Sequence, residues 1–170
     1  MSDADTGQLA GFLPYQLSVT SNAVSSLIAE RYRKRFALKI PEWRIMAVLG
    51  DAGRMTQRGL TAATVMDKVA VNRAVKVLED RGLIARVPNP GDGRSHLLEL
   101  TGEGRAIHAE VMPLARATER ELLDRLAPGE EVLLRDLLAR LRSRAGQLTR
   151  AAATDDIIPK SDERGSSDFG

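Results

Sequence analysis

Apolar residues recur every three or four positions along most of the chain, which is the pattern of amphipathic helices. The first such stretch runs from Phe12 to Phe36 and predicts one long helix. Pro41 fits the first turn of a second helix, because the N–H that proline lacks has no partner there. Thr56 and Asp67 are suited to cap a short third helix and a fourth helix that ends near Asp80, since their oxygens can accept from first-turn N–H groups.

The period of the pattern changes after Gly82. Residues 83–87 and 96–100 are short β-favouring runs on either side of a turn cluster rich in proline and glycine, which predicts a two-stranded hairpin. Thr101 can then cap a further helix, and Pro113 within it should kink that helix or mark its effective start. A last helix begins near Pro128. From residue 151 onward the periodicity is lost, which predicts a disordered acidic tail.

The fourth helix separates two kinds of side chain. Val71, Val75 and Leu78 form an apolar face at helical spacing, whereas the opposite face carries amide and basic groups. Two helices joined by a tight turn, followed by a hairpin with Arg94 at its tip, are ordered as in a winged helix-turn-helix, whose second helix enters the major groove of DNA. The predicted fold class is mainly α with a small two-stranded β wing. The predicted organisation is N-terminal helices at 10–50, the winged lobe at 51–100, C-terminal dimerisation helices at 101–150 and the tail at 151–170.

Charge supports a polyanionic partner for that lobe. The chain carries a net charge of +2, but residues 151–170 sum to −3 and residues 1–150 to +5. Within residues 54–96, eight basic side chains stand against four acidic ones. A local basic excess of this kind indicates nucleic-acid binding.

Composition excludes several classes of protein. The chain has no cysteine and two histidines, His96 and His108, so thiol chemistry is ruled out and we expect neither a metal nor another cofactor. It has no phosphate-binding glycine motif, so we do not expect an enzyme. No apolar run approaches the ~18 residues of a membrane span and the first residues are acidic, so we expect a cytoplasmic protein.

The segment from Met66 to Arg86 (MDKVAVNRAVKVLEDRGLIAR) and the wing sequence Asp92-Gly93-Arg94, leading into Leu100-Thr101, resemble the multiple-antibiotic-resistance regulator (MarR) family. The resemblance extends over roughly residues 10–148. It implies a homodimeric transcriptional regulator, usually a repressor, that binds a pseudo-palindromic operator. It also implies release from DNA when a small, often aromatic, ligand enters a pocket between the dimerisation and DNA-binding regions.

The resemblance and the polar face of the fourth helix together give the expected DNA contacts. In the family's wing motif, the arginine at the position of Arg94 enters the minor groove and the aspartate at Asp92 holds it, although Gly93 stands where the family often has a basic residue. Asn72 and Arg73 suit adenine and guanine edges respectively. A solvated polar face and a surface ion pair are the alternatives. The expected DNA-binding residues are Lys68, Ala70, Asn72, Arg73, Lys76, Asp92 and Arg94.

The resemblance also implies where an effector binds. An aromatic wall with a few polar groups would suit a phenol, an aromatic acid or its coenzyme A thioester. As alternatives, Trp43 is simply a core residue and His108 a polar surface residue. The expected effector-binding residues are Phe12, Tyr15, Asn22, Trp43, His108 and Arg116.

The first helix and the last two carry more apolar side chains than a small winged lobe can cover. We therefore expect these helices to pair between two subunits and to bury on the order of 2,000 Å² or more. A monomer with an intramolecular bundle is the alternative.

Two further alternatives concern the DNA partner. A nonspecific architectural DNA-binding protein without an effector is the alternative to a regulator. The basic cluster at residues 31–35 is either a solvated helix end or a phosphate contact.

Overall fold

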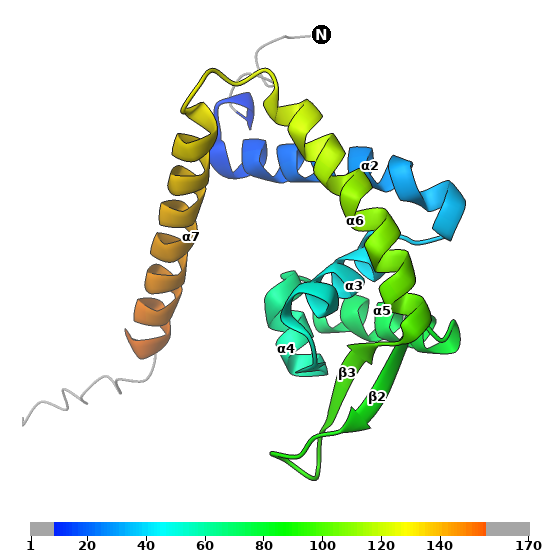
Figure 1. Cartoon of the computed structure of the whole chain (residues 1–170). Coiled ribbons are helices and arrows are strands. Elements are labelled where there is room, and N and C mark those ends of the chain that lie inside the picture. Colours follow the sequence, from blue (N-terminus) through cyan, green and yellow to red (C-terminus); the bar gives the residue numbers. More distant parts are fainter. Residues whose placement is uncertain (1–8, 156–170) are drawn as a thin grey trace, which may run out of the picture. The chain divides into compact units, whose positions relative to one another are not determined.

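A computed structural model describes residues 9–155 of the chain. It is mainly helical with a small antiparallel sheet, which confirms the predicted fold class (Figure 1). The chain divides after Leu122 into two compact units. The elements are α2 (Leu13–Phe36), α3 (Ile40–Ala52), β1 (Met55–Thr56), α4 (Gln57–Thr64), α5 (Lys68–Asp80), β2 (Ile84–Pro88), β3 (His96–Leu100), α6 (Gly102–Leu123) and α7 (Glu130–Asp155).

The core of the first unit lies where α3, α4 and α5 pack against the sheet. Its largest side chains are almost fully buried, and each contributes about 1.5 to 3 kcal/mol by leaving water. They include Tyr32, Leu38, Ile45, Met46, Leu60, Val71, Val75, Leu78, Leu83, Leu98 and Val111. The buried face of α5 is therefore the predicted apolar face, and this packing fixes which side of the helix faces outward.

The sheet has three strands in the order β1-β3-β2. Strands β2 and β3 form the predicted hairpin, with Ile84 opposite Leu100 and Pro88 opposite His96. The prediction of two strands was incomplete, because Met55 in β1 also pairs with Leu98. A strand of two residues is too short to produce a recognisable alternation of apolar and polar positions.

Three predicted helix caps are confirmed by hydrogen bonds. The Thr56 hydroxyl accepts from the N–H of Gly59 at 3.1 Å, and the Asp67 carboxylate accepts from the N–H of Ala70 at 2.8 Å. The Thr101 hydroxyl accepts from the N–H of residue 104 at 3.1 Å. Each cap satisfies an N–H group that has no partner within its helix, so these residues fix where α4, α5 and α6 begin.

The C-terminal helices differ from the prediction at two points. Helix α6 runs from Gly102 through Pro113 to Leu123, so the proline does not mark its start. Helix α7 continues to Asp155, past the predicted start of a disordered tail at residue 151, and the rest of that tail lies outside the described residues. Within residues 9–155, no helix combines the length and apolar character needed to span a bilayer.

Candidate nucleic-acid interface

The outward face of α5 carries the charged and amide side chains that the sequence placed there. Lys68, Asn72, Arg73 and Lys76 are exposed, and Ala70 is half-buried. Asp67 caps the helix and Val71 anchors its buried side, so the first turns project from the lobe with their polar side exposed. Side chains on the first turns of such a helix can reach base edges in a major groove.

Two grooves flank α5 and divide this face. The groove on the α4 side, of about 670 Å³, is lined by Gln57, Arg58, Thr61, Ala62, Lys68 and Asn72. The groove on the α3 side, of about 510 Å³, is lined by residues that include Lys39, Ala70, Arg73 and Lys76. The groove on the α4 side has two cationic and no acidic lining residues, and the groove on the α3 side has three cations against Glu42 and Asp80, so the lining of each is net positive and can face a phosphate. Arg58 and Lys39 are not among the DNA contacts expected from the sequence, because neither lies on α5, on the wing or in the basic cluster at residues 31–35.

Asn72 is held by side chains from neighbouring elements. Its Oδ1 accepts a hydrogen bond from Nε2 of Gln57. The Oε1 of Gln57 in turn lies 3.4 Å from Nη2 of Arg86, and Arg86 is paired with Glu79 through two hydrogen bonds of 2.6 and 3.2 Å. The sequence analysis did not single out Gln57, Glu79 or Arg86, because their contacts form only when α4, α5 and β2 come together.

Two exposed valines also lie at this surface. Val69 is 57% exposed on α5, and Val65 is 87% exposed in the turn that precedes it. Val65 has φ of 53°, a left-handed conformation that a β-branched residue adopts only when its surroundings impose it. Apolar side chains in this position can contact the methyl group of thymine. Neither valine could be found from the polar and basic positions by which the sequence predicts DNA contacts.

The wing tip is ordered by local hydrogen bonds. Asn89 Nδ2 donates to the hydroxyl of Ser95 at 2.8 Å, and the Asp92 carboxylate accepts from the backbone N–H of Arg94 at 3.0 Å. Asp92 thus holds the backbone of the tip in the free chain, and the contact with the guanidinium that the family motif implies stays a prediction for the DNA complex. Among residues 9–155, no partner bonds the Arg94 guanidinium, which leaves all five of its donors available to a ligand.

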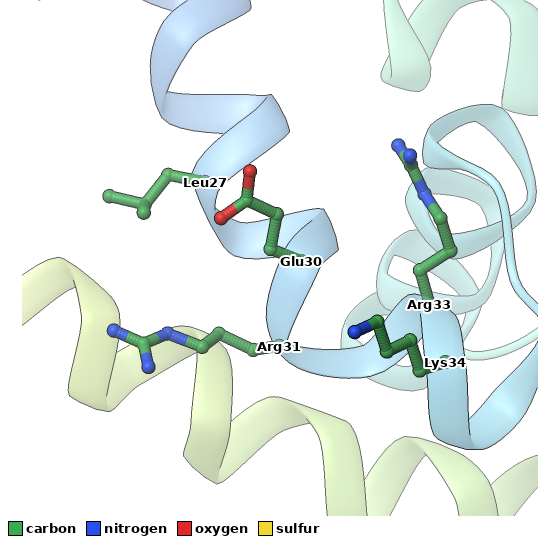
Figure 2. Close-up of a pocket in the computed structure, with 5 residues that line it drawn as sticks. All are labelled: Leu27, Glu30, Arg31, Arg33 and Lys34. Carbon is green, nitrogen blue, oxygen red and sulfur yellow. The ribbon is translucent and has the colours of Figure 1, made fainter.

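Some of the basic side chains at the C-terminal end of α2 form ion pairs with α6. Arg31 forms an ion pair with Glu121 of α6 at 3.0 Å, and Arg35 pairs with Glu110 of the same helix. Figure 2 shows Arg31 extending to the same side of α2 as Leu27, beside a pocket of about 600 Å³. Leu27, Glu30, Arg31, Arg33 and Lys34 line this pocket. Two of the four cations in the cluster therefore join α2 to α6.

Two of the expected effector residues meet within the first unit. The rings of Trp43 and His108 stack with centroids 5.7 Å apart, and Tyr32 lies on Trp43 at 5.6 Å. Trp43 is buried and belongs to the core. Burial lowers the pKa of the His108 imidazole against the opposing effect of Asp51, and burial raises the pKa of the Tyr32 phenol to about 12, so both groups are neutral at pH 7.

The other expected effector residues lie apart from this aromatic cluster. Phe12, Tyr15 and Asn22 are exposed at the N-terminal half of α2, and Arg116 is exposed on α6. Tyr15 is 17 positions before Tyr32 on one helix, which at 1.5 Å per residue is about 25 Å. Among the described residues, no ring contact joins Phe12 or Tyr15 to Trp43.

Comparison with known proteins agrees with this geometry. The sequence model of the MarR family matches residues 38–95, from the start of α3 to the wing tip. Transcriptional regulator HosA of Escherichia coli O111:H- is 30% identical over 101 residues, which cover 59% of this chain and 75% of HosA. HTH-type transcriptional repressor NicR of Pseudomonas putida is 32% identical over 96 residues, covering 56% of this chain and 61% of NicR.

A solved structure extends the similarity over most of the chain. The MarR family transcriptional regulator SPO1453 of Silicibacter pomeroyi DSS-3 is 32% identical and superposes with a TM-score of 0.66. The match covers 78% of this chain and 97% of SPO1453. These three similar proteins are transcriptional regulators, and the residues that the family model matches include α5 and the first strand and tip of the wing.

Proposed function

Because this chain belongs to the MarR family of transcriptional regulators, we propose that it is a homodimeric repressor that binds a pseudo-palindromic operator and is released by a small aromatic compound. The observation that carries the proposal is the exposed face of α5 with Asn72, Arg73 and Lys76, beside a wing whose Arg94 guanidinium has no partner in the described chain. Such a face has more donors than its own lobe uses, which suits an acceptor-rich polyanion.

The proposed DNA contacts follow from the positions of these elements. Helix α5 enters the major groove, where Asn72 and Arg73 face base edges and Lys68 and Lys76 face phosphates. Arg94 at the wing tip enters the adjacent minor groove, whose narrow A·T-rich steps attract a guanidinium. The grooves on both sides of α5 accept the flanking phosphates.

Unpartnered apolar side chains support the proposed dimer. At the start of the chain's described part, Phe12, Leu13, Tyr15 and Val19 are between 46 and 56% exposed. Helix α7 buries none of its described residues and exposes a run of leucines and a valine: Val132, Leu133, Leu134, Leu137, Leu138, Leu141 and Leu148. Monomers do not keep apolar stripes of this size in water, so a second copy should cover them. Twofold symmetry then sets the two α5 helices one DNA turn apart, ~34 Å.

The proposed effector binds where aromatic rings and polar groups are available. His108 stacks on Trp43, and Tyr32 is tilted against Trp43 at 42°; a phenol, an aromatic acid or its coenzyme A thioester that displaced part of this packing would match these rings. Phe12, Tyr15, Asn22 and Arg116 would complete the site only if dimerisation brings them to it. A ligand wedged between α2 and the winged lobe changes the spacing of the two α5 helices and so favours the unbound state.

Repression is supported by the similarity to NicR, whose name describes a repressor. A dimer that occupies an operator within a promoter blocks transcription without any further partner. Release by an effector then needs only a difference in the effector's affinity for the free and the DNA-bound forms.

A gel shift tests the whole proposal. The probe is the intergenic DNA next to the protein's own coding region, at physiological salt with excess nonspecific competitor and a panel of phenols, aromatic acids and their thioesters. We expect a discrete band that one compound abolishes. Loss of all binding to the competitor would instead support a nonspecific architectural protein, since phosphate contacts are indifferent to sequence. A specific band that no compound weakens would contradict the effector part alone.

A further inference from the structure

A line of hydrogen bonds connects strand β2 of the wing to helix α5. It begins at Glu79, whose carboxylate binds Nε and Nη2 of Arg86 at 2.6 and 3.2 Å. It continues from Nη2 of Arg86 to Oε1 of Gln57 at 3.4 Å, and from Nε2 of Gln57 to Oδ1 of Asn72. The four side chains come from α5, β2 and α4, and Asn72 is the exposed end of the line.

The chemistry of arginine fixes the direction of every bond in this line. A guanidinium only donates, so Gln57 must turn its carbonyl oxygen toward Arg86. The amide nitrogen of Gln57 is then left to face Asn72, and only an oxygen of Asn72 can accept from it. Glu79 removes the remaining freedom by holding Arg86 at two points. Asn72 therefore directs Oδ1 inward and keeps its NH2 group for the outer surface.

We propose that this line of hydrogen bonds makes Asn72 a hydrogen-bond donor in the major groove and that Asn72 contacts guanine. The inference rests on the proposed operator binding. Guanine presents N7 and O6, which are both acceptors, whereas the two-point contact with adenine needs Oδ1 and Nδ2 of the same amide. Gln57, Arg86 and Glu79 are positioning residues that set the base preference through Asn72.

The relative affinity of Asn72 for adenine and for guanine can be estimated. To contact adenine at two points, Asn72 must release Gln57, and a net hydrogen bond of this kind corresponds to about a fivefold change in an equilibrium constant. A base contact at two points discriminates by about tenfold or more. Releasing Gln57 therefore offsets most of the advantage of a two-point adenine contact. The fixed outward NH2 group then favours guanine, because it meets two acceptors there but a donor, N6, beside N7 on adenine.

The test is selection of bound sequences from a pool of randomised DNA, followed by relative affinities for single-base variants of the selected site. The full-length protein is compared with Asn72→Ala and Gln57→Glu. Asn72→Ala identifies the base pair that Asn72 reads, because the variant loses the base preference at that one position of the site. The wild-type protein should prefer guanine over adenine at that position, by less than the roughly tenfold of a two-point contact.

Gln57→Glu is the decisive variant because a carboxylate can only accept. Residue 57 would still accept from Arg86 but would also accept from Nδ2 of Asn72, so the asparagine would turn its oxygen outward. The preference should then change from guanine to the bases that donate in the major groove, cytosine through N4 and adenine through N6. Arg86→Ala provides a second route, because Gln57 is then free to rotate and the preference for guanine over adenine should fall by about fivefold.

Ala62→Glu is the matched control, since it adds the same charge to the same groove. It should weaken binding to all sequences and leave the base preference unchanged. An unaltered guanine preference in both Gln57→Glu and Arg86→Ala would overturn the inference, as would an adenine preference in the wild-type protein or an Asn72→Ala variant with no altered position. If the wild-type protein enriches no sequence at all, the proposed function itself fails.

Discussion

The α-carbon of Gly104 lies directly against the backbone carbonyl oxygen of Leu83. A Cβ at position 104 would be 2.0 Å from that oxygen, well inside any real contact. The same carbonyl accepts a hydrogen bond from the N–H of Thr101 at 3.0 Å, and the Thr101 hydroxyl donates to the carbonyl of Gly82 at 2.7 Å. The first turn of α6 is thus fastened to the loop between α5 and the wing, and residue 104 must be glycine for it to fit.

Gly104→Ala should therefore destabilise the protein by about 3 kcal/mol, because the backbone at Leu83 has to move to admit a methyl group. Urea denaturation measures the change. Gly102→Ala is the control, since a Cβ there would meet nothing within 4 Å and should leave stability unchanged within about 1 kcal/mol. Equal stability of both variants would show that the first turn of α6 is not held as described.

Arg81 caps the C-terminal end of α2. Its two terminal nitrogens donate to the carbonyl of Phe36 at 2.7 Å and to that of Ala37 at 2.9 Å, groups that have no partner within the helix. Arg81→Ala should cost about 1 to 2 kcal/mol and increase amide exchange in the last turn of α2. Arg73→Ala is the control because Arg73 is exposed and makes no such contact. The free energy of unfolding of this variant should match that of the wild type. Unchanged exchange in Arg81→Ala would contradict this capping role.

The contrast between local and distant contacts explains what the sequence could predict. The caps at Thr56, Asp67 and Thr101 act within three residues of themselves, so the pattern around each one was sufficient to identify it. The polar face of α5 followed from helical periodicity in the same way. These two kinds of local signal were enough to place the recognition helix and the wing.

Contacts between distant residues could not be predicted. Arg81 meets carbonyls 44 and 45 positions away, and the line from Arg86 to Asn72 joins three elements. No spacing rule relates such residues, because their proximity arises from packing. The hydrogen bond of Asp92 could not be predicted for another reason: its carboxylate can bond either the backbone or the guanidinium of Arg94, and only the turn geometry selects the backbone in the free chain.

The free energy of unfolding should decrease at acidic pH because of His108. Its Nε2 is buried without a hydrogen-bond partner among the described residues, and burial lowers its pKa below the ordinary 6.5. As the pH falls through 6.5, the unfolded chain binds a proton that the folded protein does not, so the free energy of unfolding decreases until the lower folded pKa is reached.

Urea denaturation at pH 7.5 and 5.5 measures this decrease in the wild-type protein and in His108→Gln. The variant should lose less stability between the two pH values, because glutamine does not titrate. His96→Gln, at an exposed site on β3, should lose as much as the wild type. The same loss in His108→Gln as in the wild type would contradict the assignment to His108.

The proposed dimer predicts a large effect of one charge on α7. Leu137 is 42% exposed in the single chain, and Leu137→Arg should weaken dimerisation by roughly 3 to 6 kcal/mol, because a twofold interface contains the change twice. Light scattering should then report a monomer mass at micromolar concentration. Ser143→Arg adds the same charge six positions later, on another side of the helix, and should remain dimeric. A dimeric Leu137→Arg would place the interface elsewhere.

The two arginines at the DNA surface should produce different losses, because one is proposed to read a base and the other to enter the minor groove. Arg73→Ala should lower operator affinity by about 1 to 3 kcal/mol and relax the preference at one base pair. Arg94→Ala should reduce the preference for A·T-rich flanks and lower the salt slope of log K by about 1, since one cation leaves the negative groove.

Titrations of operator DNA at several salt concentrations separate these effects. Arg120→Ala, an exposed arginine of α6 outside the lobe, is the matched control and should bind as the wild type does. If Arg73→Ala weakened binding equally for every sequence, Arg73 would be a phosphate contact and not a base reader. If Arg94→Ala left both the flank preference and the salt slope unchanged, the wing would not contact the DNA, and the free guanidinium at its tip would need another partner.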